Sequence, residues 1–176
     1  MSISTIAARV GGVSLAAVLL LGPGVAWADS PHFIKATGTI DPTTFDYTAT
    51  WKEAGLGSTP VTYELVATKS SSTWQCFTKS NNKPQGSPQA GGAGEIVSTV
   101  TFTPHNGSIT GSASLTPEVG TASCQGGGLK LCLTAVSYDG VSITDTTTQP
   151  NVTEPLPSFT NVTVPPPSRS SSGTCQ

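Results

Sequence analysis

The sequence predicts an all-β protein: an antiparallel β-sandwich of about seven or eight strands, immunoglobulin-like in class and stapled by disulfides. Three observations predict this class. Thr is abundant, 19 Gly and 14 Pro interrupt the 176 residues at short intervals, and no long window places apolar residues at helical spacing. Apolar and polar residues instead alternate over short segments, which is typical of strands that bury one face.

The first 28 residues have the pattern of a secretory signal peptide. Arg9 precedes an apolar run from Val10 to Leu21, and Ala26-Trp27-Ala28 supplies small residues for cleavage after Ala28. A membrane anchor needs about 20 apolar residues, and Gly22-Pro23-Gly24 ends this run earlier. We therefore expect a secreted mature chain, in the extracellular space or cell envelope, without a membrane span. It would have one domain over residues 29–164 and a flexible Pro/Ser-rich tail over residues 165–176.

The first half of the domain contains three predicted strands and one long loop. His32 to Ile40 can form an opening strand, and the alternating segments Phe45 to Trp51 and Val61 to Ala67 each bury one face. The Gly-rich, Pro-terminated segment Gly55 to Pro60 suits the connection between them. The segment from Lys79 to Gly94 is polar and shows no periodicity, so it is predicted to be a long exposed loop.

The sharpest local prediction is a hairpin. Asn106-Gly107 suits a two-residue type I′ turn, which would oppose Phe102 to Gly111 and Val100 to Ala113. This register places one apolar set on one face, namely Ile96, Val100, Phe102, Ile109, Ala113 and Leu115. It places a hydroxyl set on the other face, namely Thr99, Thr101, Thr103, Thr110, Ser112 and Ser114.

The second half predicts a strand from Leu129 to Tyr138 and a last short strand from Ser158 to Val164. Asp139-Gly140 permits either a tight hairpin into Val141 to Thr147 or a bulge within one long strand. The pattern does not choose between them, and it leaves the strand order and the oligomeric state open.

The four cysteines all follow the signal peptide, and an exported chain meets conditions in which thiols pair. A zinc site is not indicated, because no two cysteines form a closely spaced pair and no His lies near them. Four cysteines allow three connectivities. We prefer Cys76 with Cys124, since both end apolar segments beside polar loops, which leaves Cys132 with Cys175.

No motif for catalysis, a cofactor or a metal is present, so the chain is predicted to be a non-enzyme without cofactors. His32 begins the mature chain and His105 lies in the predicted turn, so both are read as solvated. Gly91-Gly92-Ala93-Gly94 lacks the Lys-Ser/Thr of a phosphate loop and reads as a flexible loop. The carboxylates are also read as solvated, at turns or on polar strand faces: Asp41, Asp46, Glu53, Glu64, Glu95, Glu118, Asp139, Asp145 and Glu154.

Charge and aromatic residues bound the partners. Charged residues are 10% of the chain, the formal net charge is −2, and the cations after residue 28 are scattered along the sequence. Nucleic acid and anionic membranes are therefore not expected. Trp51 shares the inward face of its strand, whereas Trp74 can pack over the disulfide or contact a partner. Trp74, Lys83 and Pro84 are the possible partner contacts.

Small exported proteins of high-GC Gram-positive (actinobacterial) bacteria resemble this chain from Phe33 to Thr147. The resemblance is carried by Ala36-Thr37-Gly38, Tyr63-Glu64-Leu65-Val66-Ala67, Trp74-Gln75-Cys76, Asn81-Asn82-Lys83-Pro84-Gln85, Ile109-Thr110-Gly111-Ser112, Val136-Ser137-Tyr138 and Thr144-Asp145-Thr146-Thr147. It implies export, a β-rich domain and a bridge from the cysteine of Trp-Gln-Cys to Cys124. It implies no activity and no site. Antibiotic-carrying chromoprotein apoproteins are similar in class, as acidic, Thr/Gly-rich sandwiches with two disulfides, but their closely spaced cysteine pairs are absent here. Subtilisin-inhibitor-like proteins are similar in being small, exported and doubly bridged.

These observations predict an exported, non-catalytic binding or surface-interaction module whose partner is an extracellular protein or a cell-wall component. A small-ligand carrier would instead need a deep apolar pocket, and a protease inhibitor a protruding loop at Lys83-Pro84 stiffened by the bridge. A secreted hydrolase would need a site assembled only by the fold, with two or more of five side chains in one cleft: Asp41, Asp46, Glu64, Asp139 and His105.

Overall fold

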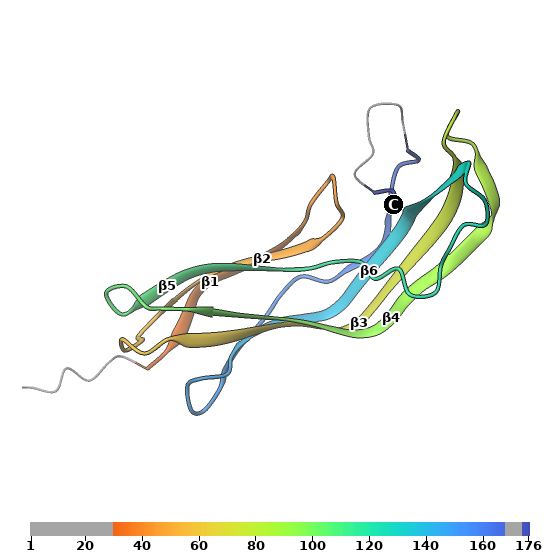
Figure 1. Cartoon of the computed structure of the whole chain (residues 1–176). Coiled ribbons are helices and arrows are strands. Elements are labelled where there is room, and N and C mark those ends of the chain that lie inside the picture. Colours follow the sequence, from red (N-terminus) through yellow and green to blue (C-terminus); the bar gives the residue numbers. More distant parts are fainter. Residues whose placement is uncertain (1–29, 168–173) are drawn as a thin grey trace, which may run out of the picture.

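The computed structural model describes residues 30–167 and 174–176, and these form two antiparallel sheets packed face to face (Figure 1). The predicted signal peptide at residues 1–28 and residues 168–173 of the predicted tail lie outside the described residues. The strands are β1 (His32–Ile40), β2 (Tyr47–Ala54), β3 (Val61–Thr78), β4 (Pro84–Phe102), β5 (Ser108–Leu115), β6 (Leu129–Asp145), β7 (Val152–Pro155) and β8 (Phe159–Thr163).

One sheet has the order β1-β2-β5, and the other has the order β4-β3-β6-β7, with β8 also paired to β6. The predicted all-β, disulfide-stapled sandwich of seven or eight strands is therefore confirmed, with eight strands. A search of the described residues for a helix that could cross a membrane found none.

The core lies between the sheets and is rich in aromatic rings. Trp51 of β2 is 2% exposed, and its ring centre lies 4.9 Å from that of Tyr63 and 5.8 Å from that of Phe102. Burying one large apolar side chain stabilises the fold by about 1.5–3 kcal/mol. The prediction that Trp51 faces inward with Phe45 and Tyr47 is confirmed, since all three are buried.

The turn at Asn106-Gly107 is confirmed, but the hairpin ladder predicted from it is wrong. Both residues have positive φ, 51° and 71°, and His105 pairs with Ser108. Beyond that pair the strands separate, because β4 pairs with β3 and β5 pairs with β2 in the opposite sheet. The predicted apolar side chains of both strands still point into the core. Phe102 and Gly111 therefore meet across the sandwich, where a Cβ on Gly111 would lie 3.0 Å from the Phe102 ring.

The choice left open at Asp139-Gly140 is resolved as one long strand, β6. Gly140 has φ 60°, and a Cβ there would lie 2.2 Å from Thr68 Oγ1, so the position suits glycine alone. The last predicted strand appears as β8, and the connection predicted at 55–60 joins β2 to β3.

The predicted exposed loop from Lys79 to Gly94 is wrong. Only a short turn follows β3, and β4 begins at Pro84 and pairs with β3 along its length. The polar composition of this segment is that of an edge strand. Where neither face of such a strand is fully buried, apolar side chains need not alternate along it.

Candidate binding site: a disulfide-stapled arm

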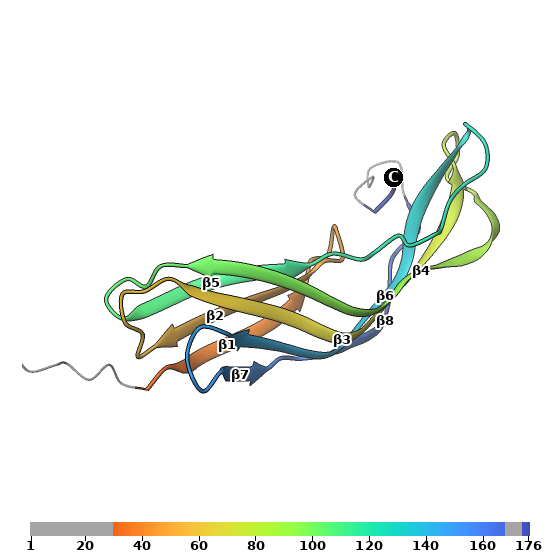
Figure 2. The same ribbon diagram turned by 60° about the horizontal axis from the view of Figure 1, so that its bottom comes forward.

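The second sheet is longer than the first and continues beyond it as an arm (Figure 2). We define the arm as Ser70–Thr78 of β3, Pro84–Gly94 of β4 and Leu129–Tyr138 of β6, with the segments that connect or cover them. The arm bends away where the β3–β4 register shifts, between Ala67 and Ser70, and where Gly140 has its positive φ. Tyr138 anchors this bend, because its hydroxyl group donates to the carbonyl oxygens of Phe45 and Leu115, each at 3.1 Å.

The segment after β5, residues 116–128, covers one face of the arm. The carbonyl oxygen of Glu118 accepts hydrogen bonds from the Ser72 hydroxyl group, from Trp74 Nε1 at 3.1 Å and from the Gly92 amide at 2.9 Å. A Cβ on Gly91 would lie 2.1 Å from Ser72 Oγ and 2.6 Å from that carbonyl oxygen. The glycines predicted to form a flexible loop are instead strand residues, and Gly91 and Gly92 allow this close approach.

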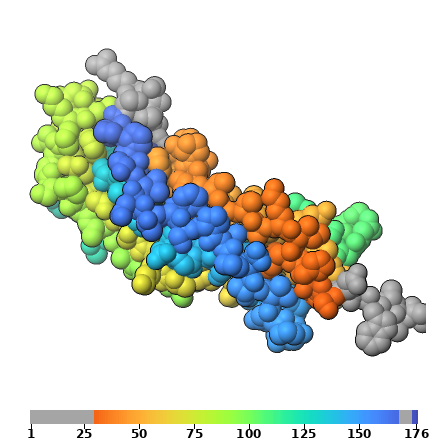
Figure 3. Space-filling model, turned by 180° about the vertical axis from the view of Figure 1, so that it is seen from behind, coloured from red at the N-terminus to blue at the C-terminus, as the bar shows by residue number. Residues whose placement is uncertain are grey.

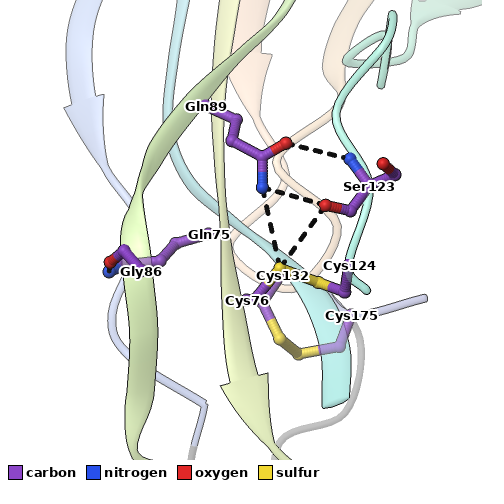
Figure 4. The surroundings of a disulfide bond; sticks show 8 residues. All are labelled: Gln75, Cys76, Gly86, Gln89, Ser123, Cys124, Cys132 and Cys175. Carbon is purple, nitrogen blue, oxygen red and sulfur yellow. Dashed lines mark hydrogen bonds between the residues drawn. A yellow bond between two sulfur atoms is a disulfide. The ribbon is translucent and has the colours of Figure 1, made fainter. Parts of the chain in front are cut away.

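Cys76–Cys124 and Gln89 fix the far part of the same segment (Figure 4). The Gln89 side-chain amide makes two hydrogen bonds to the backbone of Ser123. Gln89 Nε2 donates to Ser123 O at 3.0 Å, and Ser123 N donates to Gln89 Oε1 at 3.1 Å. Nε2 also lies 3.6 Å from Cys76 Sγ. The Gln89 side chain thus makes the two hydrogen bonds that a neighbouring strand would otherwise make beside the Cys76–Cys124 disulfide.

Cys132–Cys175 fastens the C-terminal residues to the edge of β6. Leu133 N donates to Thr174 O at 2.9 Å, and Leu131 and Gln176 exchange two backbone bonds. The structure thus contains the two pairs preferred from the sequence. The three terminal residues, predicted to belong to a flexible tail, are instead paired with β6. Figure 3 shows the end of the chain lying along the arm.

Of the predicted partner contacts, Trp74 lies in a different environment from Lys83 and Pro84. Trp74 is only 4% exposed. It helps to line a pocket of about 240 Å³ at the junction of arm and sandwich, with Thr44, Asp46, Thr116, Pro117, Leu133 and residues 174–176. Lys83 and Pro84 are exposed at the tip of the arm, where the chain turns from β3 into β4.

The turn at the tip, Lys79–Lys83, is held by its own hydrogen bonds. Thr78 N donates to Lys83 O at 2.9 Å, Lys83 N donates to Thr78 Oγ1 at 3.0 Å, and Asn82 N donates to Thr78 O at 3.0 Å. Asn82 takes the left-handed conformation, with φ 56°, which Asn tolerates better than most residues. The tip is therefore a fixed surface feature.

The fold gathers three lysines that appear scattered in the sequence. Lys79 and Lys83 flank the turn, and Lys130 is the register partner of Phe77 on the neighbouring strand. Lys79 Nζ donates to Gly127 O at 3.2 Å, which ties the turn to the Gly126–Gly128 loop. Residues 70–94 and 119–138 contain these three lysines and no Asp or Glu. The covering segment also contains Glu118, whose carboxylate lies beside Gly92. With a formal net charge of −2 for the whole chain, the arm therefore carries +2 and the remainder −4.

The fold brings Glu53 and Asp145 together, and the expectation that these carboxylates are solvated is wrong. Both are 0% exposed. Tyr63 Oη donates to Glu53 Oε2 at 2.7 Å, and Asp145 accepts bonds from the backbone of Thr147 and Thr148. Burial raises the pKa of Glu53, and the nearby charge of Asp145 raises it further. The pair lies in the core and not in a cleft.

Comparison with known proteins gives no match to a family model, to a curated protein or to a solved structure.

Proposed function

We propose that this chain is an exported, non-catalytic binding module that contacts an extracellular protein or cell-wall partner through the tip of its arm. Export is supported by the signal-peptide pattern of residues 1–28 and by two disulfides, which persist in oxidising compartments. The proposal places Lys83 and Pro84 at the contact, and Trp74, which is buried at the junction of arm and sandwich, among the residues that support the arm.

The observation that carries the proposal is the arm itself. It extends past the facing sheet and is held by two disulfides, by the hydrogen bonds to the carbonyl oxygen of Glu118, and by the pairing of the C-terminal residues with β6. The sandwich has a separate core of aromatic and aliphatic residues at its centre. A rigid projection whose tip carries lysines and no acidic residue is suited to recognition, because little conformational entropy is lost when a fixed surface binds.

Two further observations favour binding at the surface over the alternatives. The pocket beside Trp74 has a volume of about 240 Å³, below the ~300–1,000 Å³ typical of small-molecule sites. Glu53 and Asp145, the carboxylates that the fold brings together, are fully buried, which favours a structural role for the pair.

The test is recovery of the protein from culture fluid and identification of what co-purifies. The wild type is compared with Lys83→Glu, which reverses an exposed charge, and with Lys52→Glu on the outer face of β2 as the matched control. We expect a specific partner to be lost with Lys83→Glu and retained with Lys52→Glu. Turnover of a polymer substrate that one Asp, Glu or His substitution abolishes would refute the non-catalytic part.

Inhibition of a protease is the second candidate, because the protruding turn at Lys83-Pro84 is stiffened by the nearby Cys76–Cys124 bridge. A lysine on a rigid loop would address a protease that cleaves after basic residues. Trypsin activity measured with increasing protein tests it. Inhibition that Lys83→Ala removes and Lys79→Ala preserves would support this candidate, and full trypsin activity at micromolar protein would exclude that class of protease.

A further inference from the structure

We propose that the tip of the arm binds an acidic polysaccharide, a glycan that carries carboxylate or phosphate groups along its chain. This inference rests on the proposed function, because it names the partner of the same surface. The shared chemistry is a flexible polymer with repeated negative charges and many hydroxyl groups.

The charge pattern supplies the first argument. Lys79 and Lys83 are exposed and Lys130 is half-buried on the adjacent strand. The acidic side chain of the arm, Glu118, lies beside Gly92 and away from the tip. Because Lys79 N donates to Gly128 O and Lys130 pairs with Phe77, the three lysines lie at the same end of the arm, and the repulsion between their charges is relieved when a polyanion binds there. The −4 on the remainder of the chain would repel the same polymer. The polymer is therefore directed to the tip and away from the sandwich.

The uncharged groups of the tip supply the second argument. Asn81, Gln85 and Gln125 are exposed side-chain amides. Asn81 Oδ1 and Gln85 Nε2 already bond within the tip, which leaves Asn81 Nδ2 as a donor, Gln85 Oε1 as an acceptor and the Gln125 amide as both for sugar hydroxyl groups. A Cβ on any of Gly126, Gly127 or Gly128 would meet no atom within 4 Å, so this part of the backbone is open to a ligand. Lysines beside amides and open backbone suit a polymer that is both charged and hydroxylated.

The side chains of the arm also argue against the other polyanions. Single-stranded nucleic acid is bound by stacking its bases on exposed aromatic rings, but Trp74 and Phe77 are only 4% and 3% exposed. Stable peripheral membrane binding combines basic residues with apolar side chains that enter the lipid. The large hydrophobic residues exposed in the described chain are Ile34 and Val97, and both lie outside the arm.

With three lysines, the tip is expected to bind one short segment of the glycan weakly and the whole polymer with a higher apparent affinity. Each lysine near an anionic surface contributes only a small amount, which salt screens. A polymer offers many equivalent segments, so that dissociation from one is followed by rebinding to the next and apparent affinity rises. We therefore expect fast exchange and pronounced salt sensitivity.

The experiment measures binding of the folded protein to immobilised polygalacturonate, phosphomannan and neutral dextran. Anionic phospholipid vesicles and single-stranded DNA are run in parallel. We expect binding to at least one acidic glycan, none to dextran, and weaker binding to vesicles and DNA. Affinity should fall by about tenfold or more between 50 and 200 mM salt. Comparison of the carboxylated glycan with the phosphorylated one identifies which acidic group is preferred.

Variants locate the site. Lys83→Glu should reduce glycan affinity about tenfold, and Lys83→Gln by less, because reversal adds repulsion to the lost attraction. The Lys83 side chain makes no hydrogen bond to any described residue, so folding is expected to be intact, and circular dichroism checks it. The control is Lys35→Gln with Lys52→Gln, two lysines paired across β1 and β2 on the outer face of the other sheet.

Each outcome decides the inference. It is overturned if neither acidic glycan binds, if dextran binds equally, if vesicles or DNA bind as tightly, or if the Lys35/Lys52 control loses as much affinity as Lys83→Glu. A co-purifying protein that depends on Lys83, found together with no glycan binding, would overturn this inference and leave the proposed function standing.

Discussion

Glu53→Gln is predicted to stabilise the protein at neutral pH. Glu53 is fully buried and accepts a bond from Tyr63 at Oε2, but its Oε1 finds no hydrogen-bond partner among the described residues, and the charge of Asp145 lies nearby. A glutamine can accept the same bond from Tyr63 and removes the buried negative charge near Asp145. An unsatisfied buried polar group costs ~1–3 kcal/mol. We therefore expect the free energy of unfolding at pH 7 to rise by ~1–3 kcal/mol.

The effect should depend on pH with a defined sign. Burial and Asp145 raise the pKa of Glu53 in the folded state, while Tyr63 and His32 lower it by less. Because the folded pKa exceeds the unfolded one, Glu53 contributes stability that is fully present below the unfolded pKa and is lost as pH rises through the folded pKa. The advantage of glutamine is therefore smallest below the unfolded pKa and grows as pH rises.

Urea unfolding at pH 3.5, 5 and 7, followed by tryptophan fluorescence, measures this difference. Glu95→Gln, an exposed residue of β4, is the control and should show no comparable trend. A Glu53→Gln variant that is less stable than wild type at pH 7, or a difference that stays constant across the three pH values, would refute the reasoning.

Three other changes test the arm by the same urea assay. Gly91→Ala places a methyl group 2.6 Å from the backbone carbonyl oxygen of Glu118 and should destabilise the fold by ~1–3 kcal/mol. In the control, Gly57→Ala, the new methyl group meets no atom within 4 Å, so stability should change by less than about 0.5 kcal/mol. Equal effects of the two substitutions would contradict the close packing at Gly91. Replacing Cys76 and Cys124 together by Ala opens a span of 48 residues and should cost up to about 4 kcal/mol by loop entropy, with a loss under about 1 kcal/mol counting against it. Tyr138→Phe removes the donor to two carbonyl groups at the bend and should cost ~1–3 kcal/mol, and an unchanged midpoint would show that water replaces it.

Local sequence patterns predicted the strands well, because one apolar face per strand is a requirement of any two-layer sandwich. The alternation around Val100 and Ala113 places both side chains inward, as the structure has them. The same alternation could not tell a hairpin from a crossing between sheets. A type I′ turn fits both, and the choice depends on whether Phe102 finds its partner beside it or across the core.

The buried carboxylates could be missed for a related reason. Glu53 lies at an inward position of β2, two residues after Trp51, and the alternation itself gave the signal. Charged residues are rarely fully buried unless paired, so the general preference was given more weight than the local pattern. Here the partner is Tyr63, which lies on a strand of the facing sheet.

The basic tip could not be predicted from spacing, since Lys130 stands far along the chain from Lys79 and Lys83. Their proximity depends on the pairing of Phe77 with Lys130, which in turn requires β3 and β6 to be neighbours and to continue past the facing sheet. The segment read as a loop was the second obstacle. A polar edge strand and a polar loop have similar compositions, and only the pairing of β4 with β3 separates them.

The arm also explains why both disulfides lie where they do. The three-stranded extension reaches past the facing sheet, so residues 116–128 cover its inner face, and β8 together with residues 174–176 lines the outer edge of β6. The cover and the terminal residues are short and irregular, and covalent links hold them against the strands. Cys76–Cys124 fastens the cover and Cys132–Cys175 fastens the edge, while the sandwich, with its aromatic core, contains no disulfide. The covalent stabilisation is thus concentrated in the part of the molecule that carries the positive charge, which is the arrangement expected if a fixed shape of the tip matters for binding.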